Sequence, residues 1–447
     1  MSRDLWRAAI AAHRFGLGAR PGEQAALADD PRGALLAQLD GPDGLPALPS
    51  SAAIARSLVG PAGRGGPGEK KNQPQRDLYE QEATARTLHR VRSPHGFRER
   101  WVAFWSNHFT VSTHNRRVLS TAGAFEREVV RPRIKAPFSA LLRASTQHPA
   151  MLSYLDNQSS IGPHSRLGRR AAGRGLNENL AREVLELHTL GVGGGYSQDD
   201  VVSLARLITG WTVDPAPIGE APPFRFNPAA HDPGPKLLLG RVYAQRGVLE
   251  GERALDDLAR HPSTAAHVAR SLAQHFVHPE APPPVVARFT RVFQDTEGDL
   301  GALAAAVVSE EMAWTTPLSR IRPPDEWLVA VGRATEMDTW MEAAPGGDDA
   351  LVRALRKLGQ APWTAPSPAG WPEEGAAWSG AEAMLSRVEL AERLAAKAAK
   401  HAGEATACAA AALGPLLSAK TGQAIAEVDD RQTAWLLLLA SPEMMRR

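Results

Sequence analysis

The sequence has almost no cysteine and no long hydrophobic run. Cys408 is its single cysteine, so an intramolecular disulfide and a cysteine-rich metal site are both excluded. Alanines surround Cys408 in an expected helix, which favours a small buried residue over a reactive thiol. An apolar run such as 434–440 has seven residues, whereas a membrane-spanning helix needs about 18. We therefore expect no membrane span.

The motifs of several common enzyme classes are also missing. The sequence contains no His-Glu-x-x-His, no Walker-type glycine loop, no Gly-x-Ser-x-Gly elbow and no dinucleotide fingerprint. Nucleotide-driven and serine-hydrolase chemistries are therefore disfavoured. The first ten residues lack the apolar core and cleavage site of a secretory signal, so we expect a cytoplasmic protein.

The composition is that of a globular protein: 43% of the 447 residues are hydrophobic and 22% are charged. The 39 glycines and 35 prolines are clustered, and the segments between the clusters have the period of amphipathic helices. We predict a mainly α, multi-helix, bundle-like body with two irregular Pro/Gly-rich segments. The alternation of Phe224, Arg225 and Phe226 also allows one short β-hairpin.

The same clusters suggest how the chain is organised. We expect N-terminal helices in 1–40, a flexible linker in 41–76 and a helical body in 77–447, because the glycines and prolines of the linker cannot bury enough apolar surface to fold. The helical body has two places for a further sub-division, near 215–245 and 361–376.

The net charge of +2 is unevenly distributed. Residues 76–182 contain 18 Lys and Arg against 8 Asp and Glu, a net +10 that leaves −8 for the rest of the chain. This asymmetry fits a surface for an anionic partner, or arginines at the rim of a helical body that the acidic remainder balances. Nucleic acid is disfavoured as the partner, because the arginines lack interleaved aromatics and a known reader motif.

The segment 177–191 combines polar and apolar helix faces. On a regular helix Glu183 and Glu186 share one face with Asn179, and His188 lies beside the apolar stripe on the other side. Two carboxylates and a carboxamide can hold a cation or position a water molecule. The alternative is a solvated face with Glu–Arg pairs such as Glu178–Arg182, and a histidine that the helix dipole favours in the last turn.

Three other segments contain candidate site residues. His108 continues an aromatic stripe with Trp101, Phe104 and Trp105, where a hydrogen-bonded core histidine is the alternative. His231 and Asp232 lie in a proline-restricted loop, where the alternative is a turn held by the aspartate. Asp156 follows an apolar run, from whose end its carboxylate can point inward.

Several segments together identify a family resemblance. They are His13-Arg-Phe-Gly-Leu-Gly18, Phe104-Trp-Ser-Asn-His-Phe109, Asn177-Glu-Asn-Leu-Ala-Arg-Glu183, Leu187-His-Thr-Leu-Gly191, Gly210-Trp211, His231-Asp-Pro-Gly-Pro-Lys236 and Pro366-Ser-Pro-Ala-Gly-Trp-Pro372. In this order they resemble the large bacterial family called domain of unknown function 1800, over nearly the whole chain. The resemblance implies one helical family domain and transfers no activity.

The resemblance also bears on partners and localisation. Many relatives are exported, and their genes often neighbour a family whose members look like sulfatases or phosphatases. In this chain the first family motif begins at His13, so we expect no export signal before it. The resemblance adds weight to a polar site assembled from several helices.

Two hypotheses follow. The first is a metal-dependent enzyme, hydrolytic or oxygen-activating, with Zn²⁺, Fe²⁺ or Mn²⁺ as the candidate cofactor. The second is a non-enzymatic binding or assembly protein that acts with the product of a neighbouring gene. The candidate catalytic residues are Glu183, His188, His231, Asp232 and Asp156. The candidate metal ligands are Glu183, Glu186, His188 and His108. The candidate binding residues are Asn107, Asn177, Glu178, Asn179, Arg182, Lys236 and Trp211.

The metal hypothesis makes a geometric prediction. The helices at 97–109 and 177–190 should pack through their apolar stripes, which places His108 and His188 at one buried interface. The proline-rich segment 215–235 should then cover the glutamates and bring His231 across to them.

Overall fold

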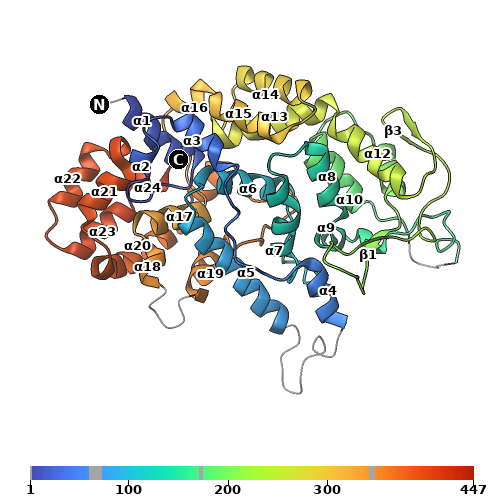
Figure 1. Ribbon diagram of the computed structural model, residues 1–447, viewed down its shortest axis with the longest axis horizontal. Helices are drawn as coiled ribbons and strands as arrows, with labels where there is room; N and C mark the ends of the chain where they lie inside the picture. The colour runs from blue at the N-terminus through green and yellow to red at the C-terminus, as the bar shows by residue number, and fades with distance from the viewer. Residues whose placement is uncertain (1–2, 60–72, 171–174, 342–347) are drawn as a thin grey trace.

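The computed structural model describes residues 3–59, 73–170, 175–341 and 348–447. Within these ranges the protein is mainly α, as the sequence predicts, and its only paired strands form two small antiparallel sheets (Figure 1). None of the helices in these ranges is both long and apolar enough to cross a membrane.

The N-terminal helices lie beside the C-terminal ones (Figure 1). Their bounds are α1 (Arg3–Ile10), the π-helical turn η1 (Ala11–Phe15), α2 (Glu23–Ala26) and α3 (Pro31–Gln38). The Gln24 side-chain amide donates to the Ala412 carbonyl at 2.7 Å, and the Trp6 indole donates to the Trp314 carbonyl at 3.1 Å. The first 40 residues therefore pack against segments about 300 to 400 residues further along the chain.

The segment 41–76, expected to be a flexible linker, contains a helix. This is α4 (Ser51–Val59), in which Ala52 and Ile54 are buried. The backbone N–H and the hydroxyl of Ser51 both donate to the Glu128 carboxylate, each at 2.6 Å. The average composition of the whole segment does not reveal this short apolar stretch. It folds because the rest of the protein covers its apolar residues. Residues 60–72 lie outside the described residues.

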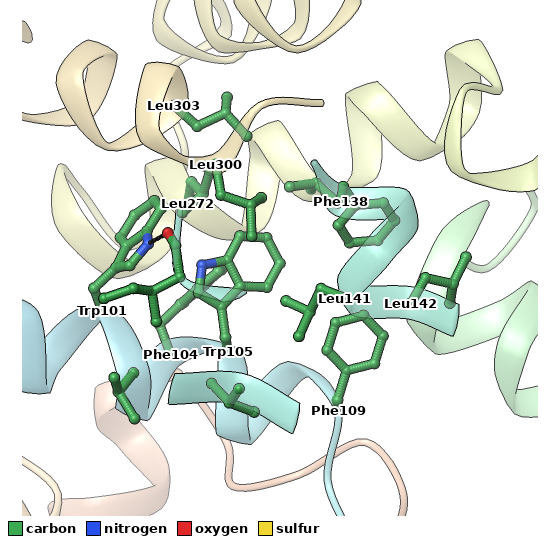
Figure 2. Close-up of a cluster of buried hydrophobic side chains, with 14 of the residues drawn as sticks. Trp101, Phe104, Trp105, Phe109, Phe138, Leu141, Leu142, Leu272, Leu300 and Leu303 are labelled. Atoms are coloured by element: carbon green, nitrogen blue, oxygen red, sulfur yellow. Dashed lines mark hydrogen bonds between the residues drawn. The ribbon is translucent and has the colours of Figure 1, made fainter. Parts of the chain in front are cut away.

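The central helices surround a core of aromatic and leucine side chains (Figure 2). They are α5 (Gln73–Arg92), α6 (Gly96–His108), α7 (Ala122–Phe125), the π-helical turn η3 (Glu126–Val130), the 3₁₀ turn η4 (Arg131–Arg133), α8 (Phe138–Gln147) and α9 (Pro149–Tyr154). Trp105 of α6 packs on Phe138 of α8, whereas Trp101 and Phe104 pack on Phe276. The Trp101 indole donates to the Ile134 carbonyl at 2.9 Å. The aromatic stripe of α6 is thus buried, as its period predicts.

The next part of the chain contains short helices and both sheets. The helices are the 3₁₀ turn η5 (Asn157–Ser159), α10 (Asn179–Glu183), the π-helical turn η6 (Val184–Thr189) and α11 (Gln198–Leu207). Ser197 and Asp200 form a capping box at the start of α11. The strands are β1 (Trp211–Val213), β2 (Phe224–Phe226), β3 (Lys236–Leu238) and β4 (Arg241–Tyr243).

The β1–β2 pairing confirms the hairpin allowed at 224–226, with Trp211 opposite Phe226. The β3–β4 hairpin is not anticipated by the sequence analysis. Its connection is Leu239-Gly240, and both residues have positive φ, 47° and 75°. Tight hairpin turns favour Asn-Gly or Asp-Gly at these two positions. Because leucine is unusual there, the sequence does not predict this turn.

The remaining helices run from the upper right of Figure 1 along its top to its left-hand side. Those packed on the first core are α12 (Val248–Ala259), α13 (Pro262–Phe276), α14 (Pro283–Asp295), α15 (Leu300–Ser309) and α16 (Glu311–Thr315). A second apolar cluster, within residues 327–445, lies among the later helices. These are α17 (Pro324–Ala334), α18 (Met337–Met341), α19 (Asp348–Lys357), η7 (Gly375–Trp378), α20 (Ala381–His401), α21 (Ala405–Leu413), η8 (Gly414–Leu416), α22 (Ala419–Ala426), α23 (Arg431–Leu439) and α24 (Pro442–Met445).

The turns η1, η3 and η6 are π-helical and interrupt the regular helical register. The sequence pattern assigns residues 177–190 to the two faces of a regular helix. This assignment holds only up to Glu183, because the π-helical turn η6 begins at Val184. Such turns occur often at functional sites. Each of the three contains a buried ionisable side chain: His13, Glu126 and His188.

Candidate functional site

His108, His188 and His267 form a histidine cluster between α6, η6 and α13. The His108 ring lies 6.3 Å from the His188 ring and 6.0 Å from the His267 ring, measured between centroids. The Nε2 atom of His108 bonds to the His188 carbonyl at 3.1 Å, and that of His267 bonds to the Leu187 carbonyl at 3.0 Å. Carbonyls in the last turn of a helix have no intrahelical partner, so these imidazoles supply one. The predicted shared interface of His108 and His188 is confirmed.

This cluster is uncharged at neutral pH. Burial and the neighbouring His267 lower the pKa of His188 to about 3. Burial, His267 and His188 together hold the pKa of His108 well below its usual value. Neither ring nitrogen of His188 has a hydrogen-bond partner.

The two glutamates of this segment point elsewhere. The Tyr196 hydroxyl donates to Glu186 at 3.3 Å, and both Glu183 and Glu186 are half-buried. Burial and the Glu186 charge raise the pKa of Glu183. Within the described part of the chain, no three His, Cys, Asp or Glu side chains are grouped as they would be to hold a metal ion. The metal centre thus lacks a ligand set there.

His231 belongs to a separate cluster beside the two hairpins. Its Nε2 bonds to the Glu250 carboxylate, and its Nδ1 bonds to the Thr209 carbonyl at 2.9 Å. The Lys236 ammonium donates to the same Glu250 oxygen at 2.9 Å, and both side chains are fully buried. Lys236, a candidate binding residue, is therefore held in a buried ion pair. Glu250, at the start of α12, has no sequence signal that would have identified it.

Asp232 orders the loop around it. Its carboxylate accepts from the His164 backbone N–H at 2.9 Å and from the Arg206 guanidinium at 2.6 Å. Its own backbone N–H donates to the Thr209 hydroxyl at 2.9 Å. This is a turn held by an aspartate, the alternative to a catalytic role for Asp232.

Most of the other sequence candidates lie apart from these clusters. Asp156 pairs with Arg117 at 2.5 Å, and both side chains are exposed. Glu178 pairs with Arg182 at 2.9 Å, as predicted for a solvated helix face, and Trp211 is buried in the core. Asn177 is half-buried and Asn179 is exposed.

Asn107 joins α6 to the proline-rich segment near the C-terminus. Its side-chain NH₂ group donates to the Trp371 carbonyl at 3.0 Å. The Trp371 backbone N–H donates to the Asn107 side-chain oxygen at 2.7 Å. Gly370 has a φ of 80°, and a β-carbon there would lie 2.6 Å from the Asn107 side-chain oxygen. Only glycine therefore allows this close approach without displacement.

Beside this contact lies a small cavity with an ionic wall, which we call the arginine cavity. Its volume is about 80 Å³. Its wall includes residues of α5, α6 and α17, the loop before α17 and the segment 360–373. The ionisable groups of the wall are Arg86, Arg90, His275, Arg320, Asp325, Glu326 and Glu373.

The arginines of this wall have both ion-pair partners and unpaired N–H groups. Arg90 pairs with Asp325 at 2.7 Å, and Arg320 pairs with Glu373. Their side chains are only 2% and 6% exposed, yet the Nε–H of each has no acceptor. Trp363, whose ring lies under the Arg86 guanidinium at 5.5 Å, has a φ of 54°. A bulky residue in that conformation is strained, and such strain concentrates at functional sites.

A second layer of buried charge lies behind the wall. Arg100 pairs with Glu326 at 2.9 Å, and Arg447 lies 2.6 Å from the other oxygen of that carboxylate. Burial lowers the pKa of Arg100, and burial together with the nearby Arg100 and Arg320 guanidiniums lowers that of Arg447 far below its usual value. The guanidinium groups crowd one another in a poorly solvated region.

His275 also belongs to this wall. Its Nδ1 bonds to Glu373 at 2.9 Å, and the Arg447 guanidinium approaches its Nε2 at 3.4 Å. Burial lowers its pKa to about 4 despite the adjacent Glu373 carboxylate. The imidazole is therefore neutral at pH 7 and both nitrogens have partners.

Sequence reasoning missed the arginine cavity almost entirely. Asn107 is the one candidate site residue in its wall. The available signal was a charged residue, Glu326, among the apolar residues of 326–331.

The described residues thus form a mainly α protein, and its buried polar clusters include the histidine cluster, the His231 cluster and the arginine cavity. The chain belongs to the family described as protein of unknown function (DUF1800), whose family model matches residues 10–446. No curated protein and no solved structure matches the chain.

Proposed function

We propose that the protein binds a small anion, with a carboxylate group as the favoured ligand, in the arginine cavity. The observation that supports this most directly is the pair of unpaired Nε–H groups of Arg90 and Arg320 in its wall. Buried donors normally have an acceptor, and an unmade hydrogen bond costs about 1–3 kcal/mol. A carboxylate has only acceptor atoms and matches guanidinium geometry.

The guanidiniums behind the wall favour an anion over a water molecule as the occupant. Burial, and after it the charges of neighbouring guanidiniums, lower the pKa values of Arg100 and Arg447, which lie behind the wall. An anion in the cavity offsets this repulsion, whereas a neutral water does so only weakly. The volume of about 80 Å³ restricts the enclosed part of the ligand to a small group.

Ligand titration calorimetry with formate, acetate, phosphate and tetramethylammonium tests this proposal. A carboxylate should bind and tetramethylammonium should not. Arg90→Lys keeps the charge but removes the Nε–H, so it should weaken binding about tenfold or more, the loss of one hydrogen bond to a charged group. Arg117→Lys, in the exposed pair with Asp156, is the matched control and should leave binding unchanged.

A second variant tests the place of binding rather than its charge. Ala103 lines the cavity and is half-buried. Ala103→Leu should block the ligand while leaving every charged group in place. If no carboxylate binds, or if carboxylate binding survives both Ala103→Leu and Arg90→Lys, the proposal is wrong.

The two hypotheses from the sequence remain predictions. Metal analysis of untagged protein, together with Glu183→Ala and His188→Ala, tests the metal-dependent enzyme. A pull-down of the neighbouring gene product tests the binding or assembly protein. Nothing in the geometry of the described residues favours either over anion binding.

A further inference from the structure

A groove with an apolar floor lies between α19 and α20, away from the arginine cavity. Its volume is about 330 Å³. Leu358 of the chain after α19 and Leu390 and Leu394 of α20 are half-buried in its lining, and Leu328 and Trp340 lie deeper. The groove exists because α19 packs mainly on α5 and α20 mainly on α23, so the facing sides of α19 and α20 are not closed against each other.

Basic side chains line both edges of this groove. Arg353 and Lys357 stand one helical turn apart on α19, and Arg393 and Lys397 stand one turn apart on α20. All four are exposed. An apolar floor between two basic edges is complementary to a ligand with an apolar stripe between two acidic edges.

One carboxylate of the protein already bridges the two edges. Glu389 of α20 lies 3.2 Å from the Lys357 ammonium and 4.0 Å from the Arg393 guanidinium. The cations of the two helices are therefore close enough to share an acidic group. Lys397 has no carboxylate partner among the residues that the structure describes.

From these observations we propose that the groove binds an acidic amphipathic helix of a partner protein. Such a helix inserts apolar residues spaced i, i+3, i+4 and i+7 and presents acidic residues on both flanks. A single-chain lipid has the right apolar character, but its one charge lies at one end and matches only one edge. The proposal is independent of anion binding in the arginine cavity.

The test uses the full-length protein and a labelled synthetic peptide. The probe is an acetylated, amidated helix of about four turns with a leucine stripe and glutamates on both flanks, measured by fluorescence anisotropy. It should bind, and its affinity should fall as salt rises. The same peptide with lysine for glutamate should bind at least tenfold more weakly.

Charge reversal at the groove provides the decisive variants. Lys357→Glu with Lys397→Glu should weaken the glutamate peptide at least tenfold, because both flanks of the helix then meet like charge. Lys400→Glu with Lys420→Glu makes the same charge change at exposed positions outside the groove lining and should have little effect. Glu389→Gln should strengthen binding several-fold, since it removes the internal competitor.

These exposed substitutions leave the core untouched, so circular dichroism should be unchanged. The proposal is overturned if the glutamate peptide does not bind, or if both charge-reversal pairs weaken it equally. It is also overturned if the protein binds phosphatidylglycerol vesicles or laurate through Lys357 and Lys397 but not the peptide.

Discussion

Asn107 forms a two-hydrogen-bond pair with the backbone of Trp371, 264 residues away in sequence. The pair connects the last turn of α6 to an irregular proline-rich segment that has few regular backbone hydrogen bonds of its own. It also forms part of the wall of the arginine cavity. One asparagine side chain therefore holds the two sides of the cavity together.

Removing this pair should destabilise the protein. Asn107→Ala leaves the N–H and carbonyl of half-buried Trp371 without partners, and we expect a loss of about 2 kcal/mol in the free energy of unfolding, roughly two hydrogen bonds. Urea unfolding measures it. Asn179→Ala, at an exposed position, is the control and should change stability by less than about 0.5 kcal/mol. Equal effects of the two substitutions would contradict the assignment.

Gly370→Ala tests the close approach at the same place. Gly370 and Gly359 both have φ of 80°, but a β-carbon at Gly359 would meet nothing within 4 Å. Alanine at either position bears the backbone strain of about 1 kcal/mol. Only at Gly370 does it also collide with Asn107, so Gly370→Ala should cost about 1–3 kcal/mol more. Thermal unfolding of the two variants side by side measures the difference.

Acid should destabilise the protein through its buried histidines. His13 and His188 have pKa values near 3 and His275 near 4, all below the ordinary 6.5. Below pH 6.5 the unfolded chain binds protons that the folded chain does not, so stability is lost as pH falls. Each histidine contributes at most about 1.4 kcal/mol per pH unit between pH 6.5 and its folded pKa. Urea unfolding from pH 7 to pH 5 follows this loss.

His188→Leu isolates one of these contributions. Both nitrogens of His188 lack partners, so an apolar side chain of similar size loses no hydrogen bond. Below pH 6.5, the slope of the variant's unfolding free energy against pH should therefore be smaller by the uptake of about one proton. An unchanged slope of stability against pH would show that His188 is charged in the folded protein.

The buried pair of Lys236 and Glu250 should behave as a unit. Lys236→Met leaves Glu250 and His231 with an uncompensated charge in a fully buried place, and it should cost about 3–5 kcal/mol. Lys236→Met with Glu250→Gln should cost less than the sum of the two single changes. A double-mutant cycle in urea measures the coupling, and additive effects would mean that the two side chains do not interact.

The sequence by itself determined the local structure. Apolar residues at helical period and the aromatic stripe of α6 predicted helices that the structure contains. It also predicted that His108 and His188 share an interface, because each lies on or beside an apolar face that must be covered. These features depend on neighbours within about one or two helical turns, so they can be read from spacing.

The tertiary structure alone decided which polar groups meet. Arg90, Arg320 and Glu373 have no local pattern in common, and they share one cavity because the helices that contain them pack together. Likewise His231 pairs with Glu250 rather than with Glu183, and the π-helical turn at Val184 changes the direction of the residues that follow. A buried charge must find its partner in three dimensions, and sequence spacing contains no information on a partner hundreds of residues away.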